Sequence, residues 1–134
     1  MNIRIAFVCI HNSCRSQMAE AWAKALFDKR FEIYSAGTED YPEVKPLAVK
    51  VMEEAGINMD AHYPKLLKDI PDTLDVLITM GCGVECPYVP TKHREDWGID
   101  DPSGKPIDEF RKTRDIIKNK VESLIKRIDE GELL

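Results

Sequence analysis

Short apolar runs alternate along this chain with segments of helical periodicity, and this alternation constrains the fold more than any other feature. Residues 3–8 and 74–80 are mostly apolar and are followed by polar or turn residues, which predicts buried strands. Between them, Met18, Trp22 and Leu26 recur at helical spacing. Strands that alternate with helices form βαβ units, so we predict an α/β fold with a parallel sheet covered by helices on both faces.

We expect a single domain over residues 1–134, because no linker, repeat or low-complexity tract interrupts the chain. The expected elements are, in order, a strand at 3–9, a helix over 18–26, a strand at 31–35, a helix opened by Pro46 and stopped by Gly56, a strand at 74–80 and a helix over 110–128. Residues 81–106 are broken by glycine and proline and receive no element. The last helix should turn its apolar positions inward, namely Phe110, Ile117, Val121, Leu124 and Ile128.

Charge and composition exclude several classes of protein. The chain carries 24 acidic and 19 basic residues, for a net charge of −5, so it lacks the basic surface of a nucleic-acid-binding protein. Its longest apolar run, residues 5–10, is far too short to cross a bilayer, and its first residues do not resemble a secretion signal. We therefore expect a cytoplasmic monomer without a cofactor, whose 4 cysteines are catalytic or redox-active rather than structural.

The segment after the first predicted strand, residues 9–16, has the form Cys-x5-Arg-Ser. Ligands of parallel sheets bind beyond the carboxyl ends of the strands, and a loop that enters a helix can direct successive N–H groups at one anion. Arg15 can add a two-pronged contact to two oxygens, and the same donors favour the thiolate form of Cys9. We therefore expect Cys9 to attack a tetrahedral oxyanion. The expected oxyanion-binding residues are Ile10, His11, Asn12, Ser13, Cys14, Arg15 and Ser16.

Residues 7–20, with the sequence FVCIHNSCRSQMAE, resemble the signature of the low-molecular-weight protein tyrosine phosphatase family. The part from Asn12 onward is similar to the thioredoxin-coupled arsenate reductase branch. Residues 34–38 resemble the family's second strand and turn, and Asp101 with the following proline resembles its general-acid loop. The resemblance covers essentially the whole chain in the same order. It implies a four-stranded parallel sheet in a three-layer fold, arsenate as substrate and thioredoxin as reductant.

The resemblance to arsenate reductases implies a role for Cys82 and Cys86. Reduction of arsenate to arsenite takes two electrons, so a second thiol must attack Cys9 and form a disulfide, which a third thiol can then accept. The sequence has this set of cysteines, and we assign the two steps to Cys82 and Cys86. Geometry permits the assignment, because residues four apart on a helical turn have Cα atoms about 6 Å apart, within disulfide range. Cys14 is the alternative third cysteine, and glutaredoxin or a small thiol is the alternative reductant.

A thiolate that attacks arsenate expels hydroxide, so a nearby carboxylic acid should protonate the leaving oxygen. Asp100 and Asp101 are equal candidates by residue type, and the resemblance selects Asp101 because a proline follows it. Trp97 is expected either to pack on the site or to anchor its loop. We assign no catalytic role to His62 or His93.

Two other functions are consistent with parts of the sequence. A phosphatase acting on phosphotyrosine or small phosphate esters would use the same nucleophile, arginine and acid. A phosphotyrosine ring needs aromatic walls, and the plausible ones are Tyr41 and Trp97. A small zinc-binding interaction module would combine the cysteines with His11 or His93, but an arginine beside a thiolate cluster has no role in such a site.

Overall fold

The computed structural model describes residues 2–81 and 89–134. Its elements are β1 (Ile3–Cys9), α1 (Arg15–Leu26), β2 (Phe31–Gly37), α2 (Pro46–Glu54), the short 3-10 helix η1 (Leu67–Asp69), β3 (Leu74–Thr79), β4 (Thr91–Asp96) and α3 (Ile107–Asp129). Each strand and helix expected from the sequence pattern is present, with ends that differ by a few residues.

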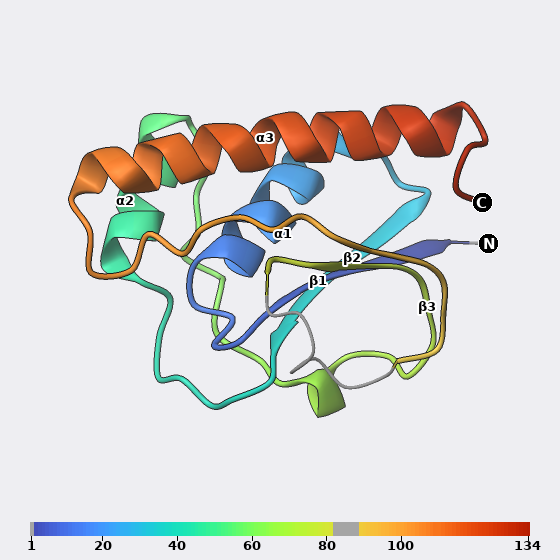
Figure 1. The fold of residues 1–134 in the computed structure, drawn as a ribbon, viewed down its shortest axis with the longest axis horizontal. Coiled ribbons are helices and arrows are strands. Elements are labelled where there is room, and N and C mark those ends of the chain that lie inside the picture. The colour runs from blue at the N-terminus through green and yellow to red at the C-terminus, as the bar shows by residue number, and fades with distance from the viewer. Residues whose placement is uncertain (1, 82–88) are drawn as a thin grey trace.

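The strands form one parallel sheet in the order β2-β1-β3-β4 (Figure 1), which confirms the predicted four-stranded parallel sheet. The chain passes from β1 to β2 on one side and then returns to β3 on the other side of β1. Ligands bind at such a reversal of strand order, beyond the carboxyl ends of the strands. Cys9, the last residue of β1, lies at this position.

Side chains that alternate along β1 divide between the two faces of the sheet. Ile5 and Phe7 are fully buried in the larger core cluster, which also contains the inner faces of α1, α2 and α3. Ala6 and Val8 belong to a smaller cluster on the opposite face, together with Ile70 at the end of η1. Figure 1 shows the three α-helices on one side of the sheet and η1 on the other.

The long helix α3 packs across α1 and α2. Its buried positions recur every three or four residues and are Phe110, Thr113, Ile117, Val121, Leu124 and Ile128. The apolar ones among them are those that the sequence pattern predicts. Within the two described ranges, no helix combines the length and the apolar character that a membrane span requires.

The strand β4 is the element that hydrophobic periodicity does not predict. It lies within the stretch broken by glycine and proline, and it forms the sheet edge beside β3. Its side chains alternate between half-buried and exposed. An edge strand needs no fully apolar face, and charged side chains there discourage pairing with another chain. Its sequence, TKHRED, therefore resembles that of a polar loop.

Candidate active site

The loop of residues 10–14, between β1 and α1, is held from outside through its carbonyl groups. Two backbone amides, at residues 38–39, donate to the Ile10 carbonyl over 2.8 and 2.9 Å, and the Lys45 amide donates to the Ser13 carbonyl over 2.7 Å. A trans peptide directs its C=O and its N–H to opposite sides. Each outward carbonyl therefore turns the N–H of the next residue inward, toward the space above β1.

Asn12 supplies the sharp turn of this loop, because its φ of 52° lies in the left-handed region that asparagine tolerates. Its carbonyl accepts a hydrogen bond from Gln17 Nε2 over 3.1 Å. Its Oδ1 accepts two more, from the Lys65 amide and from Gln17 Nε2, each over 2.9 Å. These donors fix the orientation of the side-chain amide, so Asn12 Nδ2 faces Ser16 and donates to its Oγ over 2.7 Å.

Gly37, the last residue of β2, allows the loop to pass close to the strand. A Cβ at this position would lie 2.7 Å from the Ile10 carbonyl oxygen and 2.9 Å from the carbonyl carbon of His11. Both distances are shorter than van der Waals contact, so a side chain here would push the loop away. Gly37 is also the register partner of Cys9, and the shape of the loop thus depends on β2.

The Cys9 side chain is buried at the carboxyl end of β1, with the residue 3% exposed. Its Sγ lies 2.9 Å from Ser16 Oγ. Ser16 Oγ also accepts the hydrogen bond from Asn12 Nδ2, which holds the hydroxyl oxygen in place beside the sulfur. A serine hydroxyl can both donate and accept, so Ser16 is placed to hydrogen-bond the sulfur of Cys9.

A cavity of about 70 Å³ opens above Cys9, and its lining is Cys9, Ile10, His11, Ser13, Cys14, Arg15 and Asp101. Pockets for drug-sized ligands measure roughly 300–1,000 Å³, so this one suits an ion of a few atoms. The expected oxyanion-binding residues line it with two exceptions. Asn12 and Ser16 are fully buried and support the loop from behind.

Arg15 is the first residue of α1 and is 8% exposed. Its Nη1 donates to the carbonyls of Met80 and Ile99, the latter over 2.7 Å. Its Nη2 lies 4.0 Å from Asp101 Oδ2. The protein thus occupies Nη1, and the guanidinium presents Nη2 to the cavity that it lines.

Asp101 is the candidate acid whose position fits the cavity. Burial raises the pKa of Asp101, but hydrogen bonds from Ser103 and the charges of Arg15 and Lys45 lower it by more, so its pKa lies below the ordinary value. The Ser103 amide donates to Asp101 Oδ1 over 3.0 Å. Among the described residues, the lining includes Asp101 and not Asp100, so geometry and resemblance select the same carboxylate.

Trp97 anchors its loop and does not line the cavity. It is 8% exposed, its ring centroid lies 5.7 Å from that of Phe7, and its Nε1 donates to Glu95 over 2.7 Å. Tyr41 is therefore the aromatic side chain that remains beside the cavity, where its ring packs against His11 with centroids 4.8 Å apart.

Cys14 lines the cavity but differs from Cys9 in its electrostatic environment. Burial, followed by the charges of Asp101 and Cys9, raises the pKa of the Cys14 thiol far above its usual range, and nearby basic side chains offset only part of this rise. Cys14 therefore stays protonated at neutral pH and is a poor nucleophile.

The predicted relay cysteines, Cys82 and Cys86, lie outside the described residues, and their roles stay predictions. In the part of the chain that is described, no group of three or more histidine, cysteine or acidic side chains is arranged to hold a metal ion. His93, a candidate zinc ligand by sequence, contacts Glu95 Oε1 over 2.7 Å on β4.

Behind the loop, Gln17 of α1 connects Asn12 to the segment around residues 62–65. Gln17 Nε2 also donates to the carbonyl of Tyr63 over 2.8 Å. With its amide nitrogen directed at carbonyl oxygens, Gln17 turns Oε1 toward His62 Nδ1 at 2.8 Å. His62 Nδ1 and Gln17 Oε1 are thus hydrogen-bond partners.

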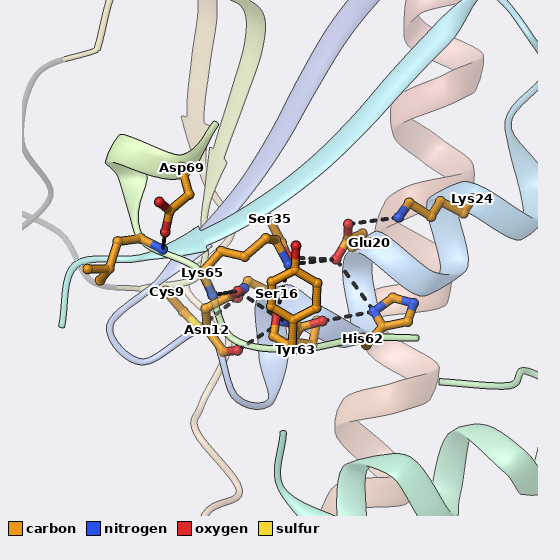
Figure 2. Close-up of polar contacts among 12 residues, drawn as sticks. Cys9, Asn12, Ser16, Glu20, Lys24, Ser35, His62, Tyr63, Lys65 and Asp69 are labelled. Carbon is orange, nitrogen blue, oxygen red and sulfur yellow. Dashed lines mark hydrogen bonds and ion pairs between the residues drawn. The ribbon is translucent and has the colours of Figure 1, made fainter. Parts of the chain in front are cut away.

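Glu20, one turn further along α1, is a buried carboxylate enclosed by donors (Figure 2). Ser35 Oγ donates to it over 2.7 Å, Lys24 and Lys65 Nζ lie at 3.0 and 3.7 Å, and His62 Nδ1 lies at 3.5 Å. Burial raises the pKa of Glu20, but hydrogen bonds from His62 and Ser35 and the lysine charges bring it down to about 2. The carboxylate stays ionised and ties the segment that positions Asn12 to α1.

Sequence reasoning missed this supporting network. Polar residues at buried positions of α1, namely Gln17 and Glu20, were the available signal. Their partner His62 is 45 residues away from Gln17, and a single sequence gives no indication of that pairing. His62 thus contacts Gln17 and Glu20 in this network.

A family model described as "Low molecular weight phosphotyrosine protein phosphatase" matches residues 4–133. The chain therefore belongs to this family, as the resemblance of its loop predicts. It is 42% identical over 123 residues to "Arsenate reductase 2" of Staphylococcus haemolyticus, a match that covers 89% of this chain and 93% of the relative. It is also 42% identical over 127 residues to an arsenate reductase of Staphylococcus aureus strain Newman, with 92% and 96% covered.

Solved structures agree with these sequence relationships. A structure described as "An arsenate reductase in the phosphate binding state" superposes with a TM-score of 0.86 at 39% identity, covering 94% of this chain and 98% of that one. A thioredoxin-dependent arsenate reductase of Corynebacterium glutamicum superposes with a TM-score of 0.79 at 31% identity, covering 97% of this chain and 63% of that one.

Proposed function

We propose that this chain is an arsenate reductase, which converts arsenate to arsenite through the Cys9 thiolate and draws electrons from thioredoxin. The observation that carries this proposal is the small cavity into which N–H groups of the loop turn and which Cys9, Arg15 and Asp101 line. The arsenate reductases among its relatives, one of them thioredoxin-dependent, support the substrate and the reductant.

In the first step, arsenate binds to the inward N–H groups and to Arg15, and Cys9 Sγ attacks arsenic. A sulfur–arsenic bond forms, an arsenic–oxygen bond breaks, and the leaving oxygen departs as water after Asp101 protonates it. The bound anion offsets the positive charges that lower the pKa of Asp101, so substrate binding favours the protonated form that the step requires.

In the second step, the Cys82 thiolate attacks Cys9 Sγ. A disulfide forms and the sulfur–arsenic bond breaks with its electron pair left on arsenic, so arsenic is reduced from As(V) to As(III) and arsenite leaves. The Cys86 thiolate then attacks Cys82, which releases Cys9, and the dithiol of thioredoxin reduces the Cys82–Cys86 disulfide. The raised pKa of Cys14 favours Cys86 over Cys14 as the third cysteine.

Hydrolysis of small phosphate esters is the second candidate activity, and membership of the phosphatase family favours it. It needs the same Cys9, Arg15 and Asp101, with water in place of the second thiol. Because Trp97 is buried against Phe7, Tyr41 is the aromatic wall that remains for a phosphotyrosine ring, and we propose that small esters are preferred.

The family match over residues 4–133 supports one domain across residues 1–134. We propose that it works as a monomer in the cytoplasm, where thioredoxin is available and thiols are kept reduced.

Arsenate-dependent oxidation of NADPH in the presence of thioredoxin and thioredoxin reductase tests the proposed function. We expect turnover with wild-type protein and none with Cys9→Ser, because a serine hydroxyl there lacks an activating base. Replacing thioredoxin with glutaredoxin and glutathione tests the alternative reductant. Absence of arsenate-dependent turnover with every reductant, while p-nitrophenyl phosphate is hydrolysed, would assign the chain to the phosphatases instead.

The relay has a separate test. Cys82→Ser should stop arsenate reduction and leave p-nitrophenyl phosphate hydrolysis intact, because hydrolysis needs only Cys9 and water. Cys86→Ser should complete one turnover and retain a Cys9–Cys82 disulfide, which peptide mapping after thiol blocking detects. Full arsenate reduction by Cys82→Ser, with Cys9–Cys14 as the disulfide found, contradicts the relay.

A further inference from the structure

Lys45, the residue before α2, is fixed beside the cavity at both its ends. Its backbone amide donates to the carbonyl of Ser13, a lining residue, over 2.7 Å. Its Nζ donates to Tyr41 Oη over 2.5 Å and lies 4.6 Å from the centroid of the Tyr41 ring. That ring packs on His11, another lining residue, with centroids 4.8 Å apart. The ammonium group is therefore placed by contacts that converge on the cavity mouth.

The charge of Lys45 is not cancelled by a carboxylate in its immediate surroundings. In the ranges that the structure describes, Lys45 has no ion-pair partner, and the neutral Tyr41 hydroxyl accepts its hydrogen bond. The adjoining segment carries three exposed carboxylates, Glu39, Asp40 and Glu43. Lys45 is thus a cation that follows these carboxylates along the chain, and its side chain is held by Tyr41.

The charge of Lys45 also reaches the residues that line the cavity. It lowers the pKa of Asp101 and opposes the rise in the pKa of Cys14. A cation whose field acts on both side chains acts on an anion held between them as well. Arg15 commits Nη1 to two backbone carbonyls, so a second positive charge at the mouth adds to what the guanidinium supplies.

We propose that Lys45 is a second cation of the oxyanion site and makes it prefer doubly charged over singly charged tetrahedral anions. This deepens the proposed function, on which it rests, since arsenate is present both as a monoanion and as a dianion near neutral pH. The attraction between a fixed cation and an anion is proportional to the charge of the anion. Lys45 therefore contributes twice as much binding free energy for a dianion as for a monoanion of the same shape. Tyr41 acts as a positioning residue by holding Nζ.

Sulfate and perchlorate are the probes that isolate this effect, because both are tetrahedral, neither titrates near neutral pH, and they differ in charge. Their dissociation constants are measured by calorimetry on reduced protein. For Lys45→Gln we expect the dissociation constant of sulfate to rise about fivefold and that of perchlorate only about twofold. Perchlorate has half the charge of sulfate and so loses half the binding free energy, which corresponds to the square root of the change for sulfate. Raising the salt concentration should shrink both differences.

Two control variants separate the local charge from other effects. Lys50→Gln makes the same change in net charge at an exposed position of α2 and should leave both dissociation constants unchanged. Lys45→Arg keeps the charge and should bind both anions as wild type does. In the arsenate assay, Lys45→Gln should raise KM about fivefold, because the variant lacks a charge that binds the substrate anion.

Equal weakening of sulfate and perchlorate by Lys45→Gln would overturn the proposal, because a purely structural role affects both anions alike. An equally large effect of Lys50→Gln would overturn it too, by showing that net charge alone is responsible. The binding measurements involve no arsenate. If Lys45→Gln weakens sulfate binding more than perchlorate binding but arsenate turnover is absent, Lys45 keeps its role and the reductase assignment fails. If arsenate is turned over but the two anions are weakened equally, the reductase assignment stands and the role of Lys45 is rejected.

Discussion

Ser16 Oγ lies 2.9 Å from Cys9 Sγ, and the same oxygen accepts a hydrogen bond from Asn12 Nδ2. Asn12 is in turn fixed by the amide of Lys65, which lies 53 residues further along the chain. The electrostatic environment of the nucleophile is therefore set by a distant segment, and not by the loop sequence alone.

Ser16→Ala should lower the reactivity of Cys9 without changing the cavity lining. A hydrogen bond to a charged group contributes about 1.5–3 kcal/mol, so we expect the rate of Cys9 alkylation by iodoacetamide to fall roughly 10- to 100-fold. Ser123→Ala, at an exposed position of α3, is the matched control and should react like wild type. An unchanged alkylation rate in Ser16→Ala would show that the hydroxyl does not stabilise the thiolate.

Arg15→Lys should impair anion binding and turnover although it preserves the charge. A lysine ammonium cannot hold the Met80 and Ile99 carbonyls and still present a planar edge to the anion. We expect kcat/KM for arsenate to fall on the order of 10²-fold, comparable to the loss of one preorganised oxyanion donor. A near-normal kcat/KM together with normal sulfate affinity would remove Arg15 from the site.

Asp101→Asn should slow the chemical step more than it weakens binding, by roughly 10²- to 10⁴-fold in kcat for a general acid. Single-turnover measurement of arsenite release separates this step from reduction by thioredoxin. Asp100→Asn is the matched control, because Asp100 is the adjacent residue and is not among the described residues that line the cavity. Loss of the chemical step in Asp100→Asn but not in Asp101→Asn would reverse the assignment.

Glu20→Gln should make stability less dependent on pH in the acid range. The folded-state pKa of Glu20 is about 2 against an ordinary value of 4.5, so its carboxylate stabilises the fold above about pH 4.5, and this contribution disappears as pH falls toward 2. The shift corresponds to about 3 kcal/mol at neutral pH. Urea unfolding should show a large difference between wild type and Glu20→Gln near neutral pH and a small one near pH 2.

The exposed Glu122 of α3 provides the comparison for this effect. Glu122→Gln should change the free energy of unfolding little at any pH. If Glu20→Gln also unfolds like wild type near neutral pH, the buried carboxylate does not hold the segment behind the loop.

Hydrophobic periodicity was sufficient to predict β1, β3 and the helices, because each buries an apolar stripe or run. It could not predict β4, since an edge strand with alternating half-buried and exposed side chains has the composition of a loop. The βαβ pattern predicted a site beyond the end of the first strand, whereas the reversal of strand order beside Cys9 comes from the structure.

The candidate site likewise contains some residues that could be predicted from the sequence and others that could not. The loop residues and Arg15 could be predicted, because consecutive residues at the end of a strand have little freedom in where they lie. Gln17, His62 and Lys45 could not, because their contacts join segments that only the tertiary fold brings together. The side chains of Asn12 and Ser16 are buried behind the loop and do not line the cavity, a position that depends on the direction of each side chain.

The outward carbonyls of the loop give the site an intrinsic selectivity for the sign of a ligand's charge. Those of Ile10, Asn12 and Ser13 each accept a hydrogen bond from outside the loop. Rotating one of these peptides inward would break at least one such bond, at about 0.5–1.5 kcal/mol, and would direct a partial negative charge at the cavity. The loop therefore cannot adapt to a cation as readily as it receives an anion. Because the donors are oriented before the anion arrives, its binding free energy is not spent on ordering the backbone.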